Sequence, residues 1–220
     1  MGDPFRPTRR EFAIAASVLL ASCGGRTPRV PTRAAPSAIG GGAELLDTDD
    51  GTIPIGGVDP QRGSRDAHVV LVAFSDFECP YSRELATTLR RLSESRPKRL
   101  RIVFKHLPAP GRANALAAAI ATELVFLEAG SEAFWRMHDR CFDNQRALNP
   151  ARFGPWAMQE GVTADAMLSR MPEAERAVSQ HLALAKRLGL GATPHLYLNE
   201  RSIRGVHPYE RLRDWVDERL

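Results

Sequence analysis

The chain has 220 residues, of which 43% are hydrophobic and 25% are charged, and it carries a formal net charge of +4. A chain of this size can bury one good core and has little left for a second domain of equal size. The arginines that set the charge are scattered and form no basic stripe with interleaved aromatic residues, so we expect no nucleic-acid partner.

The N-terminal end is predicted to be an export signal. Arg6, Arg9 and Arg10 precede an apolar run from Phe12 to Ala21, which is too short to span a bilayer as a stable helix. The run closes with LASC, an ending that resembles a bacterial lipoprotein signal, in which cleavage leaves Cys23 as the lipid-bearing first residue. The preceding TRREF resembles a twin-arginine export motif. An ordinary signal or anchor with a stray cysteine is the alternative.

We therefore predict a lipoprotein-type signal peptide at residues 1–22 and a flexible tether at residues 23–50. The tether is rich in Gly, Pro, Ala and Arg and has no apolar period, so it cannot bury enough surface to offset its ordering entropy. In either interpretation of the signal the mature protein is exported to the cell envelope or periplasm, where disulfide chemistry is permitted. A lipid on Cys23 would hold it on a membrane.

Two buried strands and a helix are expected after the tether. His68–Phe74 and Leu100–Phe104 are apolar runs rich in β-branched residues, which are typical of central strands. Between them, Tyr81–Ser95 places three leucines at helical spacing. The order of strand, helix and strand predicts a parallel pair joined by a crossover.

A long helical region follows. Ala113–Leu127 is alanine-rich, Ser131 can cap a second helix, Asn149 followed by proline is a helix start, and a final long helix begins near Pro172. His181 lies on the apolar stripe of that last helix, so we interpret it as a packed histidine and not as a ligand.

The chain then returns to strands. His195–Asn199 and Ser202–Val206 are separated by two residues, which is the spacing of a short hairpin. Tyr209–Leu220 is expected to close the chain as a helix.

Cys79 is the candidate nucleophile. A thiol at the first turn of a helix meets unpaired backbone N–H groups and the positive end of the macrodipole, which favour the thiolate. Pro80 suits that first turn because its missing donor costs nothing there. A lone cysteine is often a small buried hydrophobe, but Cys79 has polar Asp76, Glu78 and Ser82 around it. We expect the two carboxylates to tune Cys79 or to cap the helix.

The segments FSDFECPYS, VFKHLP, AFWRMHDRCFDNQ, TPHLYLN and GVHPYERL, taken together, resemble the DsbA-like branch of the thioredoxin superfamily. The resemblance implies an α/β fold, a thioredoxin-like mixed sheet with an inserted helical subdomain at about residues 108–188, within a domain at residues 51–220. It implies that Cys79 is the catalytic nucleophile and that Pro194 is the proline whose cis peptide faces that cysteine.

The same resemblance implies a peptide site beside the nucleophile. A cis bond at Thr193–Pro194 would turn backbone groups of Thr193 outward, where an extended substrate peptide can pair with them in the manner of a strand. Pro80 and Tyr81, which follow the nucleophile, are expected to contact the same substrate.

The sequence departs from the family pattern at two positions. Ser82 stands where the second cysteine of the Cys-x-x-Cys pair is usual, and Ala73 replaces a buried glutamate often found six residues before the nucleophile. A mixed disulfide on Cys79 therefore has no neighbouring thiolate to expel the partner. Ser82 is expected to take part in the site by donating a hydrogen bond to the Cys79 thiolate.

Cys141 is the other remaining thiol if Cys23 carries lipid. We interpret it as a packed core cysteine, with a bridge to Cys79 as the alternative. His138, three residues earlier, could share a metal with Cys141, but two ligands are too few for a metal site. We expect no metal and no cofactor.

These features predict a thiol-disulfide oxidoreductase or isomerase-like protein that acts on cysteine-containing exported proteins or peptides through Cys79 alone. Such a protein needs an external resolving thiol or redox partner. The alternative is a thioredoxin-fold peptide-binding module that has lost turnover, which the absence of a second sulfur and of a carboxylate at position 73 favours. A glutathione-using transferase or isomerase is a third interpretation, although the sequence contains no recognisable glutathione motif.

Overall fold

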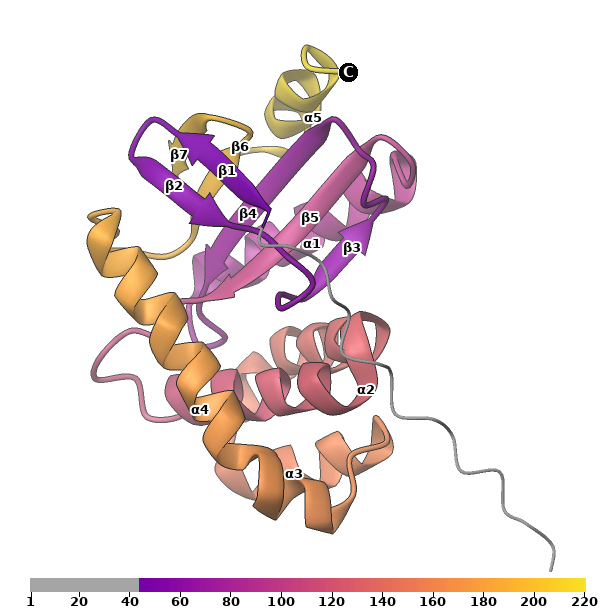
Figure 1. Ribbon diagram of the computed structural model, residues 1–220, viewed down its shortest axis with the longest axis vertical. Coiled ribbons are helices and arrows are strands. Elements are labelled where there is room, and N and C mark those ends of the chain that lie inside the picture. The colour runs from indigo at the N-terminus through magenta and orange to yellow at the C-terminus, as the bar shows by residue number, and fades with distance from the viewer. Residues whose placement is uncertain (1–43) are drawn as a thin grey trace, which may run out of the picture. The chain divides into compact units, whose positions relative to one another are not determined.

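The computed structural model describes residues 44–220. The predicted signal peptide, Cys23 and most of the predicted tether lie outside these residues. The described chain contains a five-stranded mixed sheet in the order β3-β5-β4-β6-β7 and a separate β1-β2 hairpin (Figure 1). The strands are β1 (Leu45–Thr48), β2 (Gly51–Pro54), β3 (Gln61–Gly63), β4 (Val69–Ser75), β5 (Leu100–His106), β6 (His195–Leu198) and β7 (Arg201–Arg204).

The two predicted central strands pair in parallel, with Val69 of β4 opposite Leu100 of β5 and Ser75 opposite His106. Every residue of both strands is buried. A strand covered on both faces needs apolar side chains on both sides, which explains the uninterrupted apolar runs. On the other side of β4, β6 pairs antiparallel and continues into the antiparallel partner β7. The predicted α/β fold class, the central parallel pair and the C-terminal hairpin are confirmed.

Helices cover the two faces of the sheet. One core cluster joins alternate residues of β4 to apolar residues of α1 (Pro80–Ser95) and α5 (Tyr209–Asp217). The other cluster joins the intervening residues of β4 to the β1-β2 hairpin and to α4 (Ala164–Arg187). The alternation of β4 side chains between two cores follows from the period of two in a strand. Figure 1 shows α4 and the hairpin in front of the sheet, with α1 behind it.

Between β5 and β6 the chain forms α2 (Ala115–Asp143), a short 3₁₀ helix η1 (Gln145–Ala147), α3 (Pro150–Gln159) and α4. As the sequence predicts, α2 consists of two helical halves, because Gly130 interrupts it with φ 81°. The start of α3 is also confirmed, since the Asn149 side chain accepts a hydrogen bond from the Ala151 N–H.

The predicted start of the last long helix near Pro172 is wrong. Thr163 caps α4 by accepting a hydrogen bond from the Ala166 N–H, so the helix begins at Ala164 and contains Pro172. Proline removes the N–H that would bond to the carbonyl four residues earlier. That earlier residue, Leu168, is 82% exposed, so water can satisfy its carbonyl.

The hairpin corrects the predicted end of the tether. Strand β1 falls inside the range 23–50, and its register pairs Leu45 with Pro54 and Thr48 with Gly51. Ile53 and Ile55 of this segment are 0% and 1% exposed, so residues next to the tether complete the core over β4.

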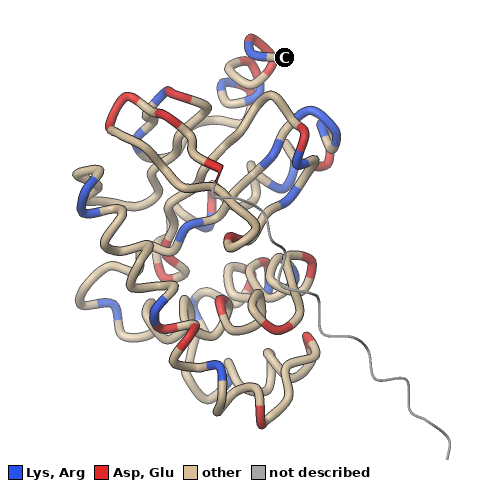
Figure 2. The backbone as a smooth tube through the Cα atoms, viewed as in Figure 1, with Lys and Arg blue, Asp and Glu red and all other residues tan. Residues whose placement is uncertain are grey.

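Acidic and basic residues are interspersed over the described chain in Figure 2, and no basic stripe stands out. Among the helices of residues 44–220, none has the length and apolar character needed to cross a membrane.

Gly63 yields a stability prediction. It has φ +95°, and a Cβ there would overlap the Leu100 carbonyl oxygen of the neighbouring strand. Gly63→Ala should therefore destabilise the fold by more than the ~1–3 kcal/mol expected for a strained backbone conformation alone. Gly161→Ala is the matched control, because Gly161 has φ +97° and a Cβ added there would have nothing within 4 Å of it. Urea unfolding of both variants measures the difference, and equal losses would contradict the overlap at Gly63.

Candidate active site

Cys79 lies at the N-cap of α1, after a turn of three residues that follows β4. Its backbone is extended (φ −82°, ψ 120°), and Pro80 occupies the first helical turn. The Cys79 N–H donates to the Asp76 carbonyl at 3.0 Å, which closes the turn between strand and helix. Among the described residues, no side chain caps this helix start. The positive end of α1 is therefore directed at the Cys79 sulfur without a competing side-chain acceptor.

The loop before β6 brings the predicted proline against this cysteine. The Thr193–Pro194 peptide bond is cis. The Cys79 Sγ donates a hydrogen bond to the Thr193 carbonyl oxygen at 3.2 Å. The geometry predicted for Cys79, Thr193 and Pro194 is therefore present, although the contact spans 114 residues of sequence.

The expected accessibility of the thiol is wrong. Cys79 is 1% exposed. Pro80 and Tyr81 are exposed, with Tyr81 at 61%, so the two predicted substrate contacts lie on the surface beside a covered sulfur. The groups that surround the sulfur are polar, since they include the Thr193 carbonyl and Ser82. Attack on a substrate sulfur therefore requires a local opening around Cys79.

Ser82 lies on the first turn of α1 and is 0% exposed. Its hydroxyl oxygen accepts a long hydrogen bond of 3.4 Å from the Asp76 N–H. The Ser82 backbone and side chain both favour the Cys79 thiolate. The hydrogen bond expected from the Ser82 hydroxyl to that thiolate stays a prediction.

Asp76 and Glu78 do not cap α1, which corrects one of the two roles expected for them. The Asp76 carboxylate accepts hydrogen bonds from the Glu78 N–H at 2.7 Å, the Ala109 N–H at 2.8 Å and the Arg112 guanidinium at 2.9 Å. The Glu78 carboxylate accepts from the backbone and side chain of Asn114. Both acids therefore fasten the loop between β5 and α2 to the turn that carries Cys79.

Arg112 is a site residue that the sequence did not identify. Its ion pair with the fully buried Asp76 carboxylate places it next to the nucleophile, and its guanidinium favours the Cys79 thiolate. Burial raises the pKa of the Cys79 thiol, but the Thr193 side chain, the backbone and side chain of Ser82 and the Arg112 guanidinium favour the thiolate, outweigh burial and leave the pKa below its ordinary value. The thiolate is therefore favoured in a covered site.

Gln145 is a second residue that sequence reasoning missed. Its side-chain amide donates to the Phe77 carbonyl at 2.8 Å and to the Cys79 carbonyl at 2.9 Å. Gln145 ends the AFWRMHDRCFDNQ segment on which the family resemblance rests, so that motif was the available signal. The amide joins the helical insertion to the turn that presents the thiol.

A groove of about 780 Å³ adjoins the site, and its lining includes Arg112, Leu116, Lys186 and Thr193. Leu116 is 51% exposed, which gives the groove an apolar contact surface. Of the described residues that line the groove, none is acidic. The groove meets Thr193 where the sequence predicts pairing with an extended peptide.

The remaining positions that the sequence analysis singled out are buried. Ala73 is 0% exposed and lies between Phe104 of β5 and Leu196 of β6. Cys141 is 0% exposed, and burial raises the pKa of its thiol to about 12, which confirms it as a packed core cysteine. Cys79 and Cys141 are both free, so the alternative of a bridge between them is not observed. His138 hydrogen-bonds to its neighbour Asp139 at 2.8 Å.

Comparison with known proteins agrees with this architecture. Residues 57–218 match the model of a family described as thioredoxin. The chain belongs to the thioredoxin family.

Within that family the chain has a DsbA-like fold. It resembles the thiol-disulfide exchange protein α-DsbA2 from Wolbachia pipientis, with a TM-score of 0.65 and 21% identity, over 73% of this chain and 86% of that one. It also resembles the compact conformation of Proteus mirabilis ScsC, with a TM-score of 0.64 and 27% identity, over 74% of this chain and 73% of that one. The predicted family is confirmed.

Two curated relatives differ in how much of their length is matched. The Na(+)/H(+) antiporter NhaA 3 from Salinispora tropica is 30% identical over 83% of this chain, but the chain spans only 28% of the antiporter. Disulfide bond formation protein D from Bacillus subtilis is 23% identical over 73% of this chain and 77% of that protein. The second relative matches over most of both lengths.

Removal of Arg112 tests its electrostatic role. Arg112→Leu should raise the pKa of the Cys79 thiol, because a positively charged group that favours the thiolate is lost. The pH at which alkylation by iodoacetamide reaches half its maximal rate should move upward, and the rate near neutral pH should fall. Arg83→Leu is the control, since Arg83 is an exposed arginine on the first turn of α1, the helix that begins next to Cys79.

The same variant changes the pH dependence of stability. The folded pKa of Cys79 lies below the unfolded value, so ionisation adds stability that is complete above the unfolded pKa and is lost as pH falls through the folded pKa. Arg112→Leu should reduce this gain in the free energy of unfolding. An unchanged alkylation profile together with unchanged pH dependence would contradict the role of Arg112.

Proposed function

We propose that this protein is an exported thiol-disulfide oxidoreductase or isomerase-like protein that works through the single nucleophile Cys79. One observation carries the proposal: the Cys79 sulfur lies at a helix start and 3.2 Å from the Thr193 carbonyl, in the loop with the cis Thr193–Pro194 bond. The names of similar proteins support the same chemistry, since they include a thiol-disulfide exchange protein and a disulfide bond formation protein.

The first step is an exchange at sulfur. The Cys79 thiolate attacks one sulfur of a substrate disulfide, a bond forms between Cys79 and that sulfur, and the other substrate sulfur leaves as a thiolate. The lowered pKa of Cys79 supports this step because only the thiolate is the nucleophile. No electrons are gained or lost overall, because one disulfide replaces another.

The second step needs a thiol from outside the site. Ser82 occupies the position from which a second cysteine would attack, and its hydroxyl does not ionise near neutral pH. An external thiolate attacks the substrate sulfur of the mixed disulfide, forms a new disulfide with it and releases the Cys79 thiolate. The protein would then act as a monothiol exchanger whose intermediate persists until that thiol arrives.

We propose cysteine-containing exported proteins or peptides as the substrates. The groove beside Thr193 offers an apolar surface at Leu116 and room for an extended segment. The backbone of Thr193 would pair with the substrate in the manner of a strand, and exposed Tyr81 would contact its flank.

A peptide-binding module without turnover is the second candidate. The 1% exposure of Cys79 favours it, because a substrate sulfur cannot reach the nucleophile without local opening. Both candidates use the same groove, and they differ only in whether a covalent adduct forms.

Trapping separates the two functions. Incubation with a disulfide-bearing peptide under non-reducing conditions should give an adduct of peptide mass on Cys79, which glutathione removes and Cys79→Ser abolishes. Ser82→Cys should shorten the adduct lifetime and raise turnover, because the new thiolate can expel the peptide. Intact-mass spectrometry over time measures both effects.

Cys141→Ala is the matched control, since Cys141 is buried in the core and should not carry an adduct. If no adduct on Cys79 can be trapped and Ser82→Cys gains no activity, the oxidoreductase function is wrong and the binding module becomes the better interpretation.

For localisation we propose attachment to a membrane of the cell envelope through lipid on Cys23. Cys23→Ser should release the protein into the soluble exported fraction, because a single lipidated N-terminus would be its main hold. Fractionation of cells followed by immunodetection measures the change. Retention of the variant in the membrane fraction would contradict lipid attachment.

A further inference from the structure

The groove next to the candidate active site carries charge of one sign. It measures about 780 Å³, and its charged lining residues are Arg112 and Lys186. The other described residues that line it are uncharged, and most of them are apolar. A cleft with charge of one sign on low-dielectric walls raises the local concentration of ligands of the opposite sign. The charges of the groove therefore influence which extended segments it prefers.

Arg112 and Lys186 do not contribute equally to this charge. The Arg112 guanidinium lies 2.9 Å from the fully buried Asp76 carboxylate, so an acidic partner already compensates it. Lys186 is exposed, and within residues 44–220 it takes part in no ion pair. A lysine ammonium is a compact charge on a flexible stem, which can adjust to a ligand. Lys186 is thus the uncompensated charge of the groove.

Lys186 shares this groove with the backbone on which a substrate is expected to pair. Thr193 also lines the groove, and its carbonyl oxygen lies 3.2 Å from the Cys79 Sγ. An extended segment that pairs with the Thr193 backbone advances about 3.3 Å per residue. Residues close to the substrate cysteine therefore enter the groove, where their side chains can meet Lys186.

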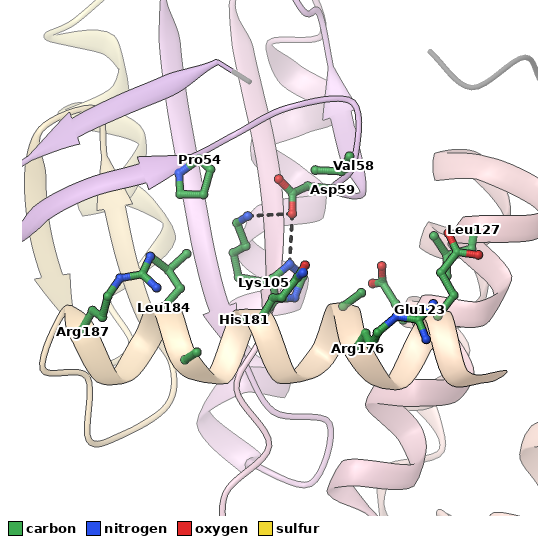
Figure 3. Close-up of a pocket in the computed structure, with 14 residues that line it drawn as sticks. Pro54, Val58, Asp59, Lys105, Glu123, Leu127, Arg176, His181, Leu184 and Arg187 are labelled. Carbon is green, nitrogen blue, oxygen red and sulfur yellow. Dashed lines mark hydrogen bonds and ion pairs between the residues drawn. The ribbon is translucent and has the colours of Figure 1, made fainter. Parts of the chain in front are cut away.

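Arg187, the next residue of α4, has different surroundings. It lines another pocket, of about 510 Å³ (Figure 3). That pocket contains the acidic residues Asp59, Glu123 and Glu173. A dashed line in Figure 3 joins the Asp59 carboxylate to the Lys105 ammonium, which lies 2.6 Å away. Two neighbouring cations at one helix end therefore lie in different electrostatic environments, and that of Lys186 adjoins the candidate nucleophile.

Lys186 also has a structural role that needs no ligand. A cation in the last turn of a helix is stabilised by the negative end of the helix macrodipole. Lys186 and Arg187 share this role, since both lie in the last turn of α4. A role in substrate selection must therefore distinguish Lys186 from Arg187.

We propose that the groove selects extended substrate segments with an acidic side chain close to their cysteine, and that Lys186 determines this preference by pairing with the acid. Apolar residues of the same segment would pack on Leu116, which is 51% exposed. The substrates would thus combine acidic and apolar residues around the cysteine. This inference rests on the proposed function of the site and adds the chemical class of its substrate.

The test measures binding without thiol chemistry. It uses the full chain with Cys23→Ser and Cys79→Ser, and fluorescent apolar peptides in which serine replaces a central cysteine. The positions on either side of that serine carry glutamate, glutamine or lysine. Fluorescence anisotropy at low ionic strength should show about tenfold tighter binding of the glutamate peptide than of the lysine peptide, because an attraction replaces a repulsion. Salt at about 0.5 M should reduce the difference, since exposed charges are screened.

Charge reversal identifies the residue responsible. Lys186→Glu should bind the lysine peptide at least as tightly as the glutamate peptide. Arg187→Glu is the matched control, because it makes the same change in net charge in the same helix turn, and it should keep the preference for glutamate. Lys186→Gln, a milder change, should reduce that preference about threefold. Circular dichroism shows that each variant is folded.

The outcomes separate this inference from the proposed function. Equal affinities of the parent for the three peptides, or equal effects of the two charge reversals, would overturn the acidic preference and leave adduct formation on Cys79 as the test of the thiol chemistry. Binding of none of the peptides would overturn the inference together with the peptide groove on which it rests.

Discussion

The carboxylate of Asp76 is the constraint on which the candidate active site depends. It is fully buried, and it accepts hydrogen bonds from the turn before α1, from the backbone of the loop after β5 and from Arg112. A buried charge is stable only when it is paired and hydrogen-bonded, so these partners cannot separate without a large cost. One side chain therefore fixes the turn that holds Cys79 and positions the cation that favours its thiolate.

The helical insertion acts on the same turn from the opposite direction. Gln145, which follows α2, donates both amide hydrogens to backbone carbonyls on either side of Glu78. The loop with Thr193 supplies a third restraint through its carbonyl at the sulfur. Three segments that are far apart in sequence thus hold one thiol in place. Their hydrogen bonds together fix the position of the Cys79 sulfur in this structure.

Features with a local cause could be predicted from the sequence. The parallel strands follow from two apolar runs, and the position of Cys79 follows from a strand that ends at Cys-Pro. Arg112 and Gln145 could not be predicted, because their roles arise from contacts across 36 and 66 residues. The exposure of Cys79 also escaped prediction, since the Thr193 loop that covers it is distant. Pro172 misled the helix assignment because a cap at Thr163 outweighed the proline rule.

The covering of Cys79 affects how the thiolate meets oxidants. Thiolates are converted by peroxide to sulfenic acid, which a nearby thiol can rescue by condensation before further, irreversible oxidation. Position 82 offers a hydroxyl, and the other thiol of the described chain, Cys141, is enclosed in the core. With 1% of its surface exposed, Cys79 is shielded from such damage in this conformation. The loop over the sulfur therefore preserves a nucleophile that has no internal means of repair.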